Sequence, residues 1–126
     1  MNYRISACIA LVVMLAGTAW AHHSRTVVFD VNQRFTRTGT LTKLDWRNPH
    51  IEFSLEAKGD QGQAESWVIE SGTPNGFAGR KIYKADFEKA IGQTFTMEVS
   101  PARDGSRIAI LRKVTFPDGR MAVIRA

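Results

Sequence analysis

The chain contains three histidines whose positions suggest metal chemistry. His22 and His23 are adjacent, and His50 follows the Asn48-Pro49 pair further along the chain. A histidine at a free N-terminus can bind one metal ion through both its α-amine and its imidazole, and a second imidazole completes a plane of three nitrogens. This arrangement, the histidine brace, suits Cu(II), which prefers tetragonal coordination by nitrogen. The sequence predicts a copper site in which His50 joins His22.

Two other ligand sets remain open. A histidine in the second position, here His23, can bind copper through the amine, its own deprotonated amide and its imidazole, which leaves His50 out. Zinc held by His22, His23 and His50 is the second choice of metal, because the chain lacks the spaced ligand pairs of a structural zinc site. Without a metal, the first two histidines would be a polar tail and the third a turn residue.

The brace requires a free amine on His22, and the preceding residues predict how that amine arises. Arg4 is followed by an almost entirely apolar stretch, residues 5–16, and then by the small-x-small pattern of residues 19–21. These are the parts of a cleavable signal peptide. We expect cleavage after Ala21 and a protein located in the periplasm or secreted. The apolar stretch is too short to span a bilayer comfortably, so we expect no stable membrane insertion after cleavage.

Composition argues against several other functions. Cys8, the one cysteine, leaves with the signal peptide, so no disulfide is expected. The formal net charge of the full chain is +5, but the basic clusters are short pairs such as Arg80-Lys81, so nucleic-acid binding is not expected. Sequence motifs for a nucleophile elbow or a phosphate loop are missing. We therefore expect a binding protein rather than an enzyme, with a copper-dependent oxidative enzyme as the last choice.

After an N-terminal arm at residues 22–34, expected to be extended and attached through Val27, Val28 and Phe29, the pattern becomes strand-like. Segments with strand character lie at residues 35–46, 50–58, 65–71, 94–100, 107–116 and 121–125. In the second of these, alternate apolar residues from Ile51 to Ala57 form one face. Residues 35–126 are therefore predicted to form a β domain.

Two irregular regions shape the predicted topology. Gly39 and a change of apolar phase after Leu41 predict a bend or bulge in the first strand. Between the third and fourth strands, a Thr73 cap before Pro74 predicts one or two short helices. There Tyr83, Phe87 and Ile91 recur at intervals of four.

This order favours a small antiparallel Greek-key barrel resembling the OB-fold, with one or two short helices between strands 3 and 4. A rolled antiparallel sheet or a lipocalin-like half barrel would give nearly the same order of elements. Trp46 and Trp67 fall on adjacent predicted strands and could line a groove, although aromatic residues at strand spacing are more often core. A module of this kind, binding a small molecule, a glycan or a periplasmic partner protein without metal, is the alternative function. Met97 and Met121 are expected to fill the core.

The chain also resembles a family of small exported bacterial proteins classed only as a domain of unknown function. The shared marks, in chain order, are His22-His23-Ser24, Phe29-Asp30, Gly39-Thr40-Leu41, Trp46-x-Asn48-Pro49-His50, Trp67, Gly72-x-Pro74-Asn75 and Pro117-Asp118-Gly119-Arg120. Residues 77–83 depart from the family pattern, where leucines and a Gly-Trp pair are common. The resemblance implies no activity; the copper site is an inference from ligand chemistry.

Overall fold

A computed structural model describes residues 25–124 of the chain. The predicted signal peptide, His22 and His23 lie outside this range. The elements are α2 (Arg25–Val28), β1 (Phe35–Asp45), β2 (Glu52–Lys58), β3 (Ala64–Glu70), α3 (Pro74–Ala78), α4 (Lys84–Glu88), β4 (Thr94–Pro101), β5 (Ile108–Thr115) and β6 (Met121–Val123). Among residues 25–124, no helix is long and apolar enough to cross a membrane.

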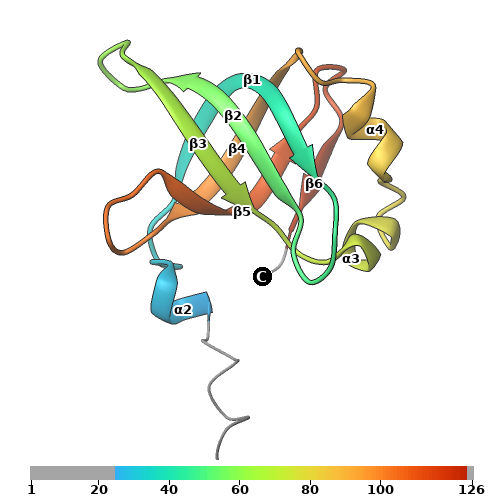
Figure 1. Ribbon diagram of the computed structural model, residues 1–126, viewed down its shortest axis with the longest axis horizontal. Helices are drawn as coiled ribbons and strands as arrows, with labels where there is room; N and C mark the ends of the chain where they lie inside the picture. The colour runs from blue at the N-terminus through green and yellow to red at the C-terminus, as the bar shows by residue number, and fades with distance from the viewer. Residues whose placement is uncertain (1–24, 125–126) are drawn as a thin grey trace, which may run out of the picture.

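The strands form one closed barrel (Figure 1). Neighbouring strands follow the order β3-β2-β1-β4-β5-β6, and an additional pairing of β3 with β5 closes five of them into a ring. This closing pair is parallel, as in Val68 opposite Ile108, whereas the other pairs are antiparallel. The segment carrying α3 and α4 connects β3 to β4. The predicted OB-fold-like barrel is confirmed, with β6 added beside β5 as a short further strand.

The bend predicted in β1 is also confirmed. Gly39 pairs with Ala57 of β2 and with Phe95 of β4, so both neighbours flank the strand at this point. The register with β2 shifts between Leu41 and Lys43, which marks the bulge. A Cβ atom on Gly39 would collide with backbone atoms of β2. Glycine therefore allows the close approach that a strongly bent strand requires.

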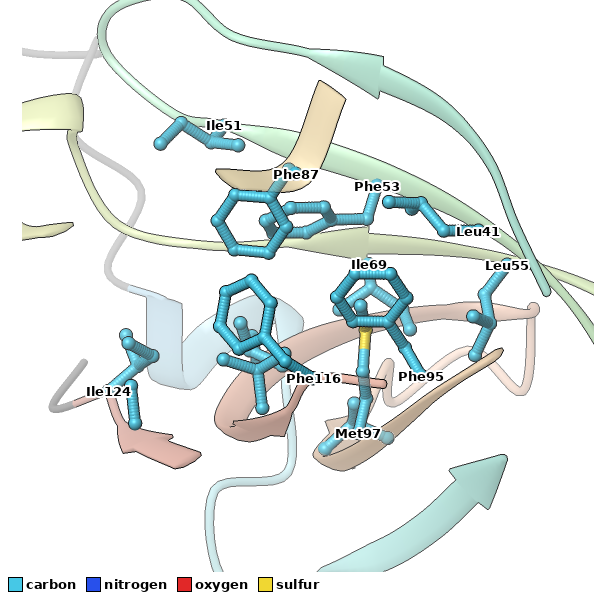
Figure 2. Packing of buried hydrophobic residues seen from close by; sticks show 14 of the residues in the cluster. Leu41, Ile51, Phe53, Leu55, Ile69, Phe87, Phe95, Met97, Phe116 and Ile124 are labelled. Atoms are coloured by element: carbon cyan, nitrogen blue, oxygen red, sulfur yellow. The ribbon is translucent and has the colours of Figure 1, made fainter. Parts of the chain in front are cut away.

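Apolar residues from all sides fill the barrel. The alternation from Ile51 to Ala57 places these side chains inside, as predicted. Figure 2 shows the rings of Phe53, Phe87, Phe95 and Phe116 gathered at the centre of the core. Phe87 comes from α4, and its ring centroid lies 4.9 Å from that of Phe53 and 4.8 Å from that of Phe116. This short helix therefore contributes a side chain to the barrel interior.

The two predicted helices exist, but the four-residue apolar series does not form one buried face. Thr73 caps α3 by accepting the Gly76 N–H, and Pro74 is its first residue, as the sequence indicated. Phe87 is fully buried, whereas Tyr83 and Ile91 are 55% and 45% exposed. The reason is length, because α4 ends at Glu88 and the outer members of the series lie beyond its regular turns.

Two further expectations were wrong in detail. The described part of the arm begins with the one-turn helix α2 rather than with extended chain, and Val27 and Val28 are exposed. Only Phe29 is buried, in a small cluster with Ala102 and Ile110 outside the main core. Met121 is 66% exposed because β6 lies at the edge of the sheet, whereas Met97 is a core residue as expected.

Candidate functional site

His50 lies at the end of the barrel where β2 begins and β3 ends. It is half-buried, in the loop between β1 and β2. The N–H of the next residue, Ile51, donates to the carbonyl of Gly72 at 3.2 Å, and the Ile51 carbonyl accepts from the Ser71 N–H at 2.8 Å. The imidazole of His50 has no hydrogen-bond partner among residues 25–124. Its side chain therefore caps no backbone group in the described part of the chain.

The arm is attached to the same end. Arg25 donates from Nη2 to the Ser71 carbonyl at 3.0 Å. Further along, the Val28 carbonyl accepts from the Arg103 N–H at 2.9 Å, and Phe29 forms an isolated antiparallel bridge with Ala102. Figure 1 shows α2 and the loop after β1 at the lower end of the barrel. The Ser71 backbone thus connects Arg25, the first described residue of the arm, to Ile51, the residue after His50.

The other two predicted metal ligands, His22 and His23, lie outside the described residues, so their approach to His50 stays a prediction. Within the part of the chain that the structure describes, no group of three or more His, Cys, Asp or Glu side chains is placed to hold a metal ion. A metal site of three ligands that includes His50 would therefore need ligands from outside residues 25–124.

Trp46 and Trp67 pack on different sets of rings. Trp46 is half-buried, with its ring centroid 5.6 Å from that of Phe77 and 5.8 Å from that of Phe87. Trp67 is only 8% exposed, and its ring lies 5.2 Å from Phe35. No ring contact joins the two tryptophans within residues 25–124. Both contribute to packing, and a ligand groove formed by the two together remains a prediction.

Glu65 is a buried carboxylate that the sequence motifs do not identify. It is 6% exposed and accepts hydrogen bonds from Trp67 Nε1 at 2.8 Å, Gln63 Nε2 at 3.0 Å and Arg37 Nε at 3.1 Å. The Trp67 hydrogen bond, followed by the Arg37 guanidinium, lowers the pKa of Glu65 despite its burial. Because these bonds are internal, the cluster stabilises the barrel wall. The sequence did contain one indication of this burial. Glu65 lies two residues before Trp67, so both side chains are on the same, buried face of β3.

A second charged cluster joins the turn before β6 to α4, beside a hollow of about 260 Å³. Arg120 Nε lies 2.8 Å from Asp118 Oδ2, and its Nη2 lies 3.4 Å from Asp86 Oδ1. The Arg120 guanidinium also lies over the Phe116 ring, 4.9 Å from its centroid. Hydrogen bonds from the Arg120 backbone and side chain lower the pKa of Asp118. The charges here are paired with one another, so the cluster anchors the turn.

A third feature is a hollow of about 270 Å³ between α2, α3 and the end of β6. It is lined by Arg25, Gly72, Thr73, Gly76, Phe77, Arg80 and Ile124. Arg80 donates to the carbonyls of Val123 at 2.9 Å and Gly76 at 2.6 Å. The hollow adjoins the Ser71 segment through Gly72 and Arg25. It therefore lies at the same end of the barrel as His50.

Comparison with protein families matches residues 10–111 to a family described as a family of unknown function, DUF6152. The match covers the loop with His50 and all or part of strands β1 to β5. No curated protein and no solved structure matches the chain. The expected membership of a family of unknown function is confirmed: the chain belongs to DUF6152.

Proposed function

We propose that this protein is exported, cleaved after Ala21, and binds Cu(II) through the His22 amine and imidazole together with the His50 imidazole. Its role would be to buffer or deliver copper. The observation that carries the proposal is the hydrogen bond from Arg25 to the Ser71 carbonyl, 3.0 Å long. It holds the start of the described arm at the end of the barrel that presents His50.

The number of residues between His22 and the anchored Arg25 is compatible with this arrangement. His22 precedes Arg25 by three residues, and an extended chain spans about 3.5 Å per residue, so the two Cα positions can be up to roughly 10 Å apart. On the barrel side, Ser71 donates to the Ile51 carbonyl, and neighbouring strands lie about 4.8 Å apart. His50 is the residue before Ile51. An arm of this length can therefore bring the N-terminus towards His50.

The ligand chemistry supports copper and makes binding pH-dependent. A free α-amine has an unperturbed pKa of about 7.7–8.0, so at neutral pH most of it carries a proton that must leave when metal binds. Copper affinity should therefore increase as the pH rises through this range. Imidazole and amine nitrogens in one plane favour Cu(II) over zinc, which prefers a tetrahedral set.

The test is a Cu(II) titration with electron paramagnetic resonance on untagged protein consisting of residues 22–126. His50→Ala, His23→Ala and a form extended by one residue before His22 are titrated in parallel, with Asn75→Ala as a surface control. A brace predicts that the extension and His50→Ala both weaken binding strongly, while His23→Ala and Asn75→Ala do not. If the extension and His23→Ala weaken binding but His50→Ala does not, copper binds through His23. Equal, weak binding by all forms would exclude the copper site.

A binding module without metal is the second candidate, favoured by the confirmed barrel topology. OB-folds bind ligands on the face of strands 2 and 3 and with the loops after strands 1 and 4. In this chain the first of these loops contains Trp46 and His50. The two candidates differ in one measurement, because a metal-free module would retain ligand binding in the presence of a strong chelator.

A further inference from the structure

Arg25 and Arg80 differ from most arginines of this barrel. Neither has a carboxylate side chain within ion-pair distance in the described part of the chain. Arginines that do have such a partner are Arg34, Arg37, Arg47, Arg103 and Arg120. Both unpaired guanidiniums line the same 270 Å³ hollow. Among residues 25–124, therefore, the two positive charges at this hollow have no anionic side chain as a partner, which makes it a positive site.

The main chain holds both guanidiniums in position. Arg25 donates to the Ser71 carbonyl at 3.0 Å, and Arg80 donates to the carbonyls of Gly76 and Val123 at 2.6 and 2.9 Å. A guanidinium has five N–H donors, so each keeps donors that no residue among 25–124 accepts. Side chains fixed in this way lose little conformational entropy when a ligand binds. The hollow therefore presents prepositioned donors for an anion.

Apart from Thr73, the other side chains that line the hollow are apolar. Phe77 is 1% exposed and Ile124 is 6% exposed, and both contribute to its lining. Gly72 and Gly76 add lining without side chains. A volume near 270 Å³ is many times that needed for one water molecule, so the hollow has room for a ligand larger than a single small ion. A small inorganic anion would pair with the arginines but would fill only part of this volume.

We propose that this hollow binds a small organic carboxylate, with the carboxylate between Arg25 and Arg80 and an apolar body against Phe77 and Ile124. Arginine pairs with carboxylates through two parallel N–H···O bonds, which fixes the orientation of the ligand. The apolar body adds burial at roughly 25 cal/mol per Å². The proposal does not depend on copper, because none of the residues that it uses is a proposed metal ligand.

Benzoate is a suitable probe, since it has a carboxylate on a compact apolar ring. Residues 22–126 are prepared metal-free in chelator and titrated with benzoate, benzyl alcohol or inorganic phosphate, and the amide resonances of the protein are followed. Arg25→Gln and Arg80→Gln are compared with Arg107→Gln, which removes the same charge from an exposed arginine that does not line the hollow. Thermal unfolding of each variant confirms that it is folded.

We expect saturable shifts of the Gly72, Thr73 and Gly76 amides with benzoate. Arg25→Gln and Arg80→Gln should each weaken binding about tenfold or more, because each removes charge-assisted hydrogen bonds, whereas Arg107→Gln should not. Saturation by phosphate at the same concentration would overturn the assignment of an organic ligand, and equal binding of benzyl alcohol would overturn the role of the charge. The site would be excluded if benzoate did not saturate the shifts at about 10 mM, which is ten times a Kd of 1 mM. It would also be excluded if all three substitutions weakened benzoate binding equally.

Discussion

Phe87 offers the most direct test of how the helical segment contributes to the barrel. Its side chain is fully buried, and its ring contacts five other aromatic rings, at centroid distances from 4.8 Å to 5.9 Å. In Phe87→Ala the whole ring is lost from the centre of the core. Substitutions of this type cost about 3–5 kcal/mol, since the surrounding residues collapse only partly into the cavity.

A loss of that size is a large share of the stability of a small domain, which is about 5–15 kcal/mol. The midpoint of thermal unfolding should fall by at least about 12 °C, at roughly 4–8 °C for each kcal/mol in a domain of this size. Urea unfolding of residues 22–126, followed by tryptophan fluorescence, measures the free energy directly. Trp46 is a useful reporter because its ring lies 5.8 Å from that of Phe87. Phe87→Leu should recover part of the loss.

Ile91→Ala is the matched control, since Ile91 belongs to the same four-residue series in the sequence. It is 45% exposed and lies beyond the end of α4. Its substitution should change the free energy of unfolding by about 0.5 kcal/mol or less. If Ile91→Ala and Phe87→Ala destabilise the protein equally, the packing described for α4 is wrong and the sequence periodicity describes the true buried face.

Two other substitutions test the barrel wall. The folded-state pKa of Glu65 is lowered from its ordinary value of 4.5, so its ionised form contributes stability above that pH, and the contribution is lost as the pH falls through the lowered pKa. The difference in unfolding free energy between wild type and Glu65→Gln, measured in urea from pH 3 to 7, should therefore shrink below about pH 4.5; a constant difference would contradict this. Gly39→Ala should destabilise the protein by about 1–3 kcal/mol, because the added Cβ would meet the Glu56 carbonyl. At Gly72 an added Cβ has open space, so Gly72→Ala should leave the melting temperature nearly unchanged.

Much of the barrel could be predicted from local patterns. The alternation from Ile51 to Ala57 identified the buried face of β2, and Gly39 with the phase change identified the bulge in β1. The Thr73-Pro74 pair identified the start of α3. Each of these signals depends on neighbours within a few residues, because strand pleat, helix capping and glycine contacts are set by local geometry.

Local sequence patterns predicted less of the candidate site than of the fold. The histidines led to the prediction that His50 is a metal ligand, which residues 25–124 do not test. No motif marked Glu65, whose partner Arg37 comes from a distant strand. Arg25 and Arg80 are 55 positions apart, and one of them falls in a basic pair that indicates only an exposed surface. Their common hollow depends on the attachment of α2 to Ser71 and on the position of β6.

The sequence by itself determined the order and inward faces of the strands, the helix start at Pro74 and the histidine chemistry that motivates the copper proposal. Only the tertiary structure decided that β3 and β5 pair in parallel to close the barrel, and that Phe87 alone of its series enters the core. It also decided that Arg25 and Arg80 face one hollow. The physical reason is that residue type and local period specify which side of an element is apolar, whereas contacts between distant residues depend on strand register and ring closure.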